Sequence, residues 1–293
     1  MDLWVLNLLN GISFGMVLFL LAAGLSLTLG VMGILNLAHG SLFMIGAFVG
    51  FFVFSGGGSF WVAALLAGAI AGLVGLVLEK AFLGRLHNLF DAQAMLLVGV
   101  VYILGNLGLW IFGPQNRLAS PPLSLAFSVR IGNYTFPAYR LALILIGTIV
   151  FISLWWLLAK TRIGAIIRAG MDDREMTTGL GVNYGLISTA VFSLGAFTAG
   201  FAGAIALPMI GVAPSIAWDI LLYSFIVVVV GGMGSMLGSL IGSLFIGLVD
   251  TFSRALFPDI ATFTLYTVLV ITLLVKPSGI LGRKGILQDM ERL

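Results

Sequence analysis

The 293-residue chain is 60% hydrophobic and 9% charged, and its mean hydropathy is +1.18. A soluble domain of this size carries roughly a quarter charged residues, so this composition excludes soluble proteins and predicts an integral membrane protein. Its net charge of +3 comes from lysines and arginines beside apolar segments, which excludes a nucleic-acid partner, and the absence of cysteine excludes disulfides and thiol chemistry.

Apolar segments long enough to cross a bilayer recur along the whole chain, which predicts an all-α polytopic bundle that forms a single domain over 1–293. Nine spans fit best, although eight or ten remain possible: 7–29, 33–54, 60–79, 92–113, 138–159, 185–207, 218–233, 235–250 and 261–276. The apolar run 216–249 would be about 51 Å long as one helix, too long for a bilayer of about 30 Å. We therefore expect breaks at Gly231-Gly232 and, for the same reason, within 30–40.

Basic residues cluster beside every second predicted span. By the positive-inside rule this side is the cytoplasm, and with nine spans the N-terminus lies outside. The basic residues on that side are Lys80, Arg85, Lys160, Arg162, Arg168, Arg174, Lys276, Arg283, Lys284 and Arg292. The opposite side receives segment 114–140, whose prolines predict an ordered outer loop, and a loop with Arg254 and Asp259.

Polar residues interrupt the apolar run at the first expected break. Asn36 and His39, three residues apart, would share a helix face, and Gly40 and Ser41 follow them. Polar residues inside a span tend to face the bundle interior and to mark a transport path, so these four residues are candidates for lining the pathway. The alternative is that Asn36 caps a helix that begins near Leu37 and that His39 only packs.

Glycines form a stripe on the predicted helix after the second break. Gly234, Gly238 and Gly242 recur every four residues, a spacing that lets another helix backbone approach closely. We expect plain helix packing there. Two glycine-rich breaks, one in each half of the chain, are also typical of transporters whose discontinuous helices flank a translocation site.

The acidic residues and histidines of this chain do not form the pattern of an ion-coupling, metal or catalytic site. Glu79, Asp91, Asp219 and Asp250 lie near predicted span ends, where carboxylates commonly reach the headgroups, and this argues against proton or sodium coupling. Two distant histidines make a metal site improbable, and no phosphate loop of the Walker type is present. The sequence therefore predicts no metal, no cofactor and no ATPase or other enzymatic site.

The charge of the chain is concentrated in one segment, residues 160–184. Four cations and three anions fall between Lys160 and Glu175, and an apolar stripe runs beside them. This pattern predicts a helix, a turn and a second short helix that ends at Gly181. An ordinary basic loop is the alternative, but the mixed charge favours a surface that docks a soluble partner in the cytoplasm.

Several of these motifs together resemble the permease subunits of ATP-driven importers for branched-chain amino acids, the LivH type. The matching elements are Asn36 to Ser41 with Gly46-Ala47, the loop from Arg168 to Asn183, the Ala199–Gly203 cluster, Gly231 to Gly238, and Lys276 to Gly282. They cover nearly the whole chain in the family's order. One departure is Thr177-Thr178, where relatives often have alanine.

The resemblance implies an ABC importer permease fold in a bacterial inner membrane. Its implied partners are a second related permease or a second copy, two cytoplasmic ATP-binding subunits and an external solute-binding protein. It implies that residues 160–184 form the coupling loop, with contacts from Arg162, Arg168, Asp172, Asp173, Arg174 and Glu175 and a turn at Gly179 and Gly181. The expected cargo is a branched-chain amino acid; the same permease type also serves urea, amides and other amino acids, and a self-sufficient carrier or channel is the alternative from another class.

Overall fold

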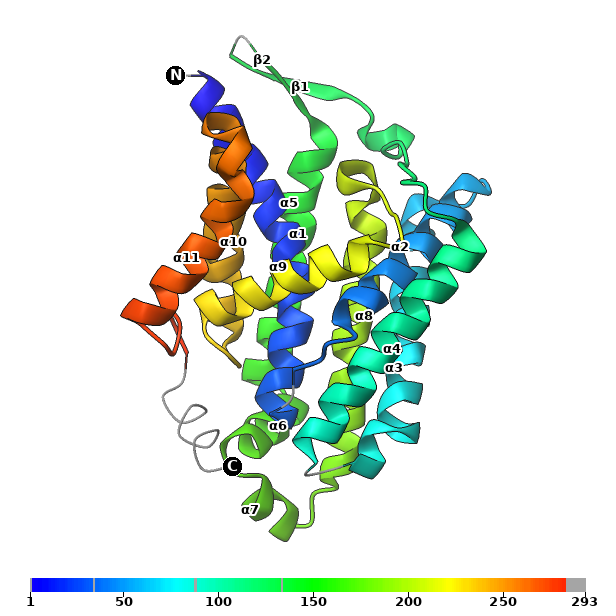
Figure 1. Cartoon of the computed structure of the whole chain (residues 1–293), viewed down its shortest axis with the longest axis vertical. Helices are drawn as coiled ribbons and strands as arrows, with labels where there is room; N and C mark the ends of the chain where they lie inside the picture. The colour runs from blue at the N-terminus through cyan, green and yellow to red at the C-terminus, as the bar shows by residue number, and fades with distance from the viewer. Residues whose placement is uncertain (1, 34, 87–88, 133, 283–293) are drawn as a thin grey trace. The chain divides into compact units, whose positions relative to one another are not determined.

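The computed structural model describes residues 2–33, 35–86, 89–132 and 134–282, and Figure 1 labels its helices and strands. Arg283, Lys284 and Arg292, which the charge pattern assigned to the cytoplasmic side, lie outside the described residues. The elements in chain order are α1 Asp2–Met32, α2 His39–Ser55, α3 Phe60–Ala81, η1 Leu83–Leu86, α4 Phe90–Phe112, η2 Leu123–Leu125, β1 Ser128–Ile131, β2 Tyr134–Pro137, α5 Ala138–Lys160, α6 Arg162–Asp172, α7 Arg174–Gly179, α8 Tyr184–Ile210, α9 Ile216–Gly231, α10 Met236–Leu256, η3 Pro258–Ile260 and α11 Ala261–Val275.

Every predicted span corresponds to a helix, so the all-α polytopic prediction is confirmed. Over the described residues, seven helices are long and apolar enough to cross a membrane. The second and seventh predicted spans are the shorter apolar helices α2 and α9, of 17 and 16 residues. The count of nine crossings therefore stays a prediction. Arg254, expected in a loop, lies instead in the last turn of α10.

Both expected helix breaks are present. α1 ends at Met32, and Gly33 follows with φ +68° before α2 begins at His39. α9 ends at Gly231, and Gly232 follows with φ +110° before α10 begins at Met236. A positive φ is strained for residues with a Cβ, so glycine at these positions stops the helix locally.

The chain separates into two compact units; three of the four boundaries fall inside α1, α5 and α9, and the fourth follows Ala119 in the connection after α4. The first unit comprises Met1–Ala22, Ser120–Phe151 and Tyr223–Leu293. Within it α1 and α10 approach closely, because the backbone of Gly11 and Gly15 lies directly against that of Gly247 and its neighbours. This unit also holds the short antiparallel hairpin of β1 and β2, in which Val129 pairs with Phe136, so the segment predicted as an ordered loop is ordered.

The second unit comprises Ala23–Ala119 and Ile152–Leu222. Its helices α2, α3 and α8 pack against one another, and α4 lies beside α2 (Figure 1). Gly46 and Gly200 bring the backbones of α2 and α8 together, and Gly200 also meets Ala67 and Ala71 of α3. One core cluster of this unit is formed by Ala38, Leu78, Leu83, Leu97, Val101 and Phe192. Small residues thus decide which helices can meet.

Candidate functional site

Residues 160–184 fold as two helices, as the sequence predicted, with side chains that cap each helix start. Thr161 Oγ1 accepts a hydrogen bond from the Gly164 amide at 3.0 Å and begins α6. Asp173 Oδ1 accepts from the Met176 amide at 2.8 Å and begins α7. α7 ends at Gly179, two residues before the predicted end, and Gly181 makes the following turn with φ +85°. Asp173, expected to make a docking contact, is in this structure the N-cap of α7.

One face of this segment is attached to α8 and to the end of α1. The guanidinium carbon of Arg174 lies 4.5 Å from the centre of the Tyr184 ring, a cation–π contact. A Cβ on Gly170 would lie 2.9 Å from the same ring, so α6 packs directly on it. The Tyr184 hydroxyl donates a hydrogen bond to the carbonyl oxygen of Val31. α6 and α7 thus reach, through one tyrosine, the last turn of α1 before its break.

The remaining face of α6 and α7 is exposed and partly apolar. Ile163, Met176 and Leu180 are all highly exposed, Leu180 at 78%, although they lie outside the predicted spans. Arg162 and Glu175 are exposed beside them. We call these five residues the α6–α7 face. Exposed apolar residues ringed by charge are typical of a protein–protein interface.

The break between α1 and α2 buries polar groups that have no hydrogen bonds. Asn36 is 1% exposed, and neither its Nδ2 nor its Oδ1 has a hydrogen-bond partner among the described residues. The Ser41 hydroxyl is buried in the same way, and His39 is also fully buried. Buried polar groups are almost always satisfied, so each exception calls for a reason.

Two expectations for this break are wrong. α2 begins at His39 with Ala38 at its N-cap and no side-chain cap, so Asn36 does not cap a helix. Asn36 lies before the helix, and its carbonyl oxygen accepts a hydrogen bond from the His39 amide at 3.1 Å in the turn that leads into α2, so the two residues share no helix face. Gly40 is explained by packing, because a Cβ there would collide with the carbonyl oxygen of Ala217.

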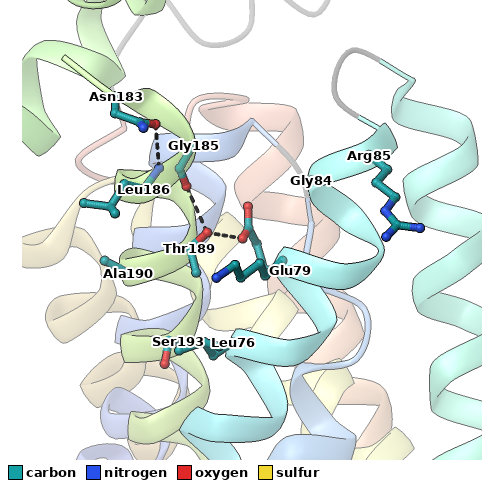
Figure 2. Close-up of a pocket in the computed structure, with 11 residues that line it drawn as sticks. Leu76, Glu79, Gly84, Arg85, Asn183, Gly185, Leu186, Thr189, Ala190 and Ser193 are labelled. Atoms are coloured by element: carbon teal, nitrogen blue, oxygen red, sulfur yellow. Dashed lines mark hydrogen bonds between the residues drawn. The ribbon is translucent and has the colours of Figure 1, made fainter. Parts of the chain in front are cut away.

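A groove of about 640 Å³ lies between α3 and α8 near the α7–α8 link (Figure 2). Glu79 lines it but is only 1% exposed, and the Thr189 hydroxyl donates a hydrogen bond to its carboxylate. Asn183 caps α8 at the same end, with Oδ1 accepting from the Leu186 amide at 3.1 Å. The expectation that Glu79 reaches the headgroups is therefore wrong.

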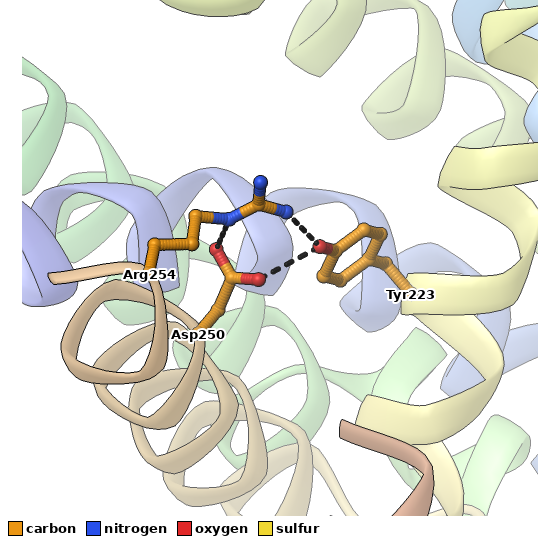
Figure 3. A network of polar contacts seen from close by, with 3 residues as sticks. All are labelled: Tyr223, Asp250 and Arg254. Atoms are coloured by element: carbon orange, nitrogen blue, oxygen red, sulfur yellow. Dashed lines mark hydrogen bonds and ion pairs between the residues drawn. The ribbon is translucent and has the colours of Figure 1, made fainter. Parts of the chain in front are cut away.

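A second buried carboxylate closes a polar triangle in the first unit (Figure 3). Asp250 is 4% exposed; its Oδ1 accepts from the Tyr223 hydroxyl at 2.9 Å and its Oδ2 from Arg254 Nε at 2.8 Å. Arg254 Nη2 donates to the Tyr223 oxygen at 3.0 Å. The triangle joins α9 to α10, so Asp250 is also no headgroup anchor, whereas Asp91 and Asp219 are exposed.

A comparison with known proteins now identifies the family. The family described as the branched-chain amino acid transport system permease component matches residues 7–274. The chain belongs to this family. It is a multi-pass membrane protein, and the resemblance drawn from the motifs is confirmed.

Relatives match this permease along almost their whole length. It is 29% identical to the high-affinity branched-chain amino acid transport system permease protein LivH of Salmonella typhimurium and to that of Escherichia coli, over 94% of this chain and 95% of each relative. It is 28% identical to the corresponding protein BraD of Pseudomonas aeruginosa, with the same shares of each chain. No solved structure matches the chain significantly.

The geometry of this permease separates the predicted site residues into groups. Arg168, Asp172 and Asp173 share the α6–α7 segment with Arg174 and Glu175, as predicted, but Arg168 is half-buried, with Nη1 enclosed and without a hydrogen bond in the described structure. Gly238 and Gly242 meet the backbone of α9, which agrees with packing, whereas Gly234 lies in the turn before α10 with φ +71° and is not part of the helix face. No cluster in the described ranges could hold a metal ion.

Sequence reasoning missed three residues of this permease that the structure makes prominent. Tyr184 was read only as the last residue of the charged segment 160–184, and Met176 and Leu180 only as loop residues. Met176 and Leu180 could have been recognised in the sequence, because apolar residues within a highly charged segment indicate a candidate interface. Nothing in the sequence pairs Tyr184 with Val31, because 153 residues separate them.

Proposed function

We propose that this chain is a permease subunit of a binding-protein-dependent ABC importer in the bacterial inner membrane. It moves branched-chain amino acids inward and uses ATP hydrolysed by separate cytoplasmic subunits. The family match over residues 7–274 supports the transport role, and the names of the relatives support the substrate class. The permease itself performs no hydrolysis and carries no cofactor.

The observation that carries this proposal is the contact path from α7 to the break after α1. Arg174 stacks on Tyr184, and Tyr184 holds the Val31 carbonyl by a hydrogen bond. Gly33, with its positive φ, follows two residues later. A displacement of α7 by a docked ATPase is therefore passed to the residues that begin the break. Coupling of distant sites requires a contiguous element of this kind with two arrangements.

The break itself is the proposed gate on the substrate pathway. In the described conformation the Asn36 amide and the Ser41 hydroxyl are enclosed without hydrogen bonds. Enclosing unpaired polar groups costs free energy, on the order of 1–3 kcal/mol for each group. Opening the break would give these groups water or the ammonium and carboxylate of an amino acid as partners. His39 lies on the first turn of α2 beside them, and Gly40 lets that turn approach Ala217.

The α6–α7 face is the proposed docking surface for the ATP-binding subunits. Ile163, Met176 and Leu180 supply apolar contact, and Arg162 and Glu175 supply charges of both signs at its edge. Asp173, Gly179 and Gly181 shape α7, and Arg168 and Asp172 belong to the adjoining end of α6. An external solute-binding protein delivers the amino acid, and a second permease chain completes the pathway.

The test measures leucine uptake and ATP hydrolysis by the complete transporter in proteoliposomes. Wild-type uptake should require ATP and should resist competition by urea and acetamide. Tyr184→Phe keeps the ring under Arg174 and Gly170 but removes the hydrogen bond to Val31, so hydrolysis should continue while uptake falls. Tyr134→Phe, at an exposed tyrosine of β2, is the control and should behave as wild type. Accumulation of leucine by the purified chain alone, on an ion gradient without ATPase subunits, would refute the proposal.

A further inference from the structure

Helix α4 exposes an amide side chain on an otherwise apolar surface. Most of α4 is exposed, and Asn106 lies on its exposed side. Its Nδ2 donates to the Tyr102 carbonyl at 2.8 Å, whereas nothing in the described structure donates to its Oδ1. Asn106 stands six residues before the helix end at Phe112, about 9 Å along the axis, and so within the apolar part of the predicted span.

The residues around Asn106 allow another helix to approach. Gly99, Ile103, Asn106 and Trp110 follow one another at spacings of four, three and four, which places them on one helix face. A Cβ on Gly99 would meet nothing within 4 Å, so this glycine is not explained by packing inside the chain. Trp110 is 84% exposed at the end of the same face. We call these four residues the α4 face.

The exposed face of helix α11 provides a comparison, because its composition suits contact with lipid. The helix is the least buried of the candidate spans, and its exposed residues include Phe263, Val270 and Leu274. Its exposed Thr267 donates back to the carbonyl oxygen of Phe263 at 2.8 Å, so the hydroxyl proton is satisfied within the helix. Asn106 Oδ1 receives no hydrogen bond within its own helix, and lipid tails carry no donor that could supply one.

We propose that the α4 face packs against a transmembrane helix of the second permease chain and that this helix donates a hydrogen bond to Asn106 Oδ1. This inference rests on the proposed function, which requires a second permease. The depth of Asn106 excludes the cytoplasmic ATPases and the external binding protein as occupants. Asparagine hydrogen bonds and small residues are the usual means by which helices associate in a bilayer.

Photocrosslinking of the complete transporter in native membranes tests which occupant covers the face. A benzophenone side chain at Ile103 should give an adduct whose second peptide, identified by mass spectrometry, comes from an apolar segment of the second permease chain. The matched control is the same probe at Val270 of α11, which should label only lipid. Lipid-only labelling at Ile103, or a peptide from any other subunit, would overturn the proposal.

Substitutions provide a second, quantitative arm. Asn106→Leu and Gly99→Leu should each lower recovery of the paired permeases in detergent by about threefold to tenfold. Thr267→Leu on α11 is the control and should leave recovery unchanged. Unchanged recovery for both α4 variants contradicts the proposed face. Neither measurement uses ATP or uptake, so a failure of the interface is distinguishable from a failure of the proposed transport function.

Discussion

The two glycine-rich breaks look alike in sequence and differ in their surroundings. After α9, the break is held by the chain that follows α11: the Ile280 amide donates to Val230 at 2.8 Å and the Leu281 amide to Gly231 at 2.9 Å. After α1, the break encloses Asn36, whose amide has no hydrogen bond in the described structure. A glycine with positive φ stops both helices. The α9–α10 break is held by two backbone hydrogen bonds from the chain after α11, whereas the α1–α2 break is held at Val31 by the Tyr184 hydroxyl and leaves the Asn36 side chain without a hydrogen bond in the described structure.

This difference assigns different roles to the two breaks. Backbone hydrogen bonds, glycine contacts and the triangle of Tyr223, Asp250 and Arg254 make the α9–α10 connection rigid. Unmet polar groups raise the free energy of the α1–α2 connection in this conformation, which supports the proposal that this connection moves. The following substitutions test the proposed division into one fixed connection and one that moves.

Gly238→Leu should produce the largest effect, at the rigid break. A Cβ at Gly238 would clash with the Gly231 carbonyl, so a leucine forces α9 and α10 apart at a cost of about 3 kcal/mol. Thermal unfolding of the purified chain in detergent measures this loss. Gly105→Leu on α4, where a Cβ meets nothing within 4 Å, is the control and should keep wild-type stability. Equal melting temperatures for the two variants would mean that the α9–α10 contact is not tight.

Asp250→Asn should weaken the same region by a smaller amount. Asp250 is buried and hydrogen-bonded to two side chains, whereas the side chain of Arg254 is 59% exposed, which reduces the ion-pair contribution. The expected loss of unfolding free energy is about 1.5 kcal/mol. Asp259→Asn, at an exposed carboxylate of η3, should change stability by less than about 0.5 kcal/mol. If Asp250→Asn lowers the free energy of unfolding no more than Asp259→Asn does, the triangle does not stabilise the contact between α9 and α10.

Asn36→Leu should have the smallest effect on stability and the opposite sign. It removes an amide that is enclosed without partners, so the described conformation should be unchanged or about 1 kcal/mol more stable, while leucine uptake is lost. Asn10→Leu is the matched comparison, because the Asn10 amide accepts a hydrogen bond from Arg140 and its loss should destabilise the chain. Destabilisation by Asn36→Leu comparable to that by Asn10→Leu would show that Asn36 is a structural residue and not part of a gate.

Much of the architecture could be predicted from local sequence. The apolar runs predicted every helix from α1 to α11 that corresponds to a span, and their excess length together with the glycines within 30–40 and at 231–232 predicted the breaks. The two-helix form of residues 160–184 followed from the apolar stripe beside the charges, and the structure adds that Thr161 and Asp173 cap the two helices. These features depend on neighbours within a few residues.

The roles of individual polar residues could not be predicted in the same way. Glu79 and Asp250 were expected at the headgroups because they lie near span ends, yet Thr189 and Tyr223 hold them inside. Each partner is distant in the chain and comes from another helix. Position along a span sets the depth of a side chain in the membrane, but the packing of the helices sets the direction in which it points.

The amino-acid sequence by itself determined that this protein is a multi-pass membrane helix bundle of its family, with two interrupted helices and one charged segment beside the spans. Hydropathy, glycine backbone freedom and helix capping act over short distances, so they can be read directly along the chain. Only the tertiary structure decided that Tyr184 links α7 to the end of α1, that Asn36 is enclosed without partners and that Asn106 is left exposed. Those properties arise from contacts between helices, and no local pattern specifies which side chains such contacts cover.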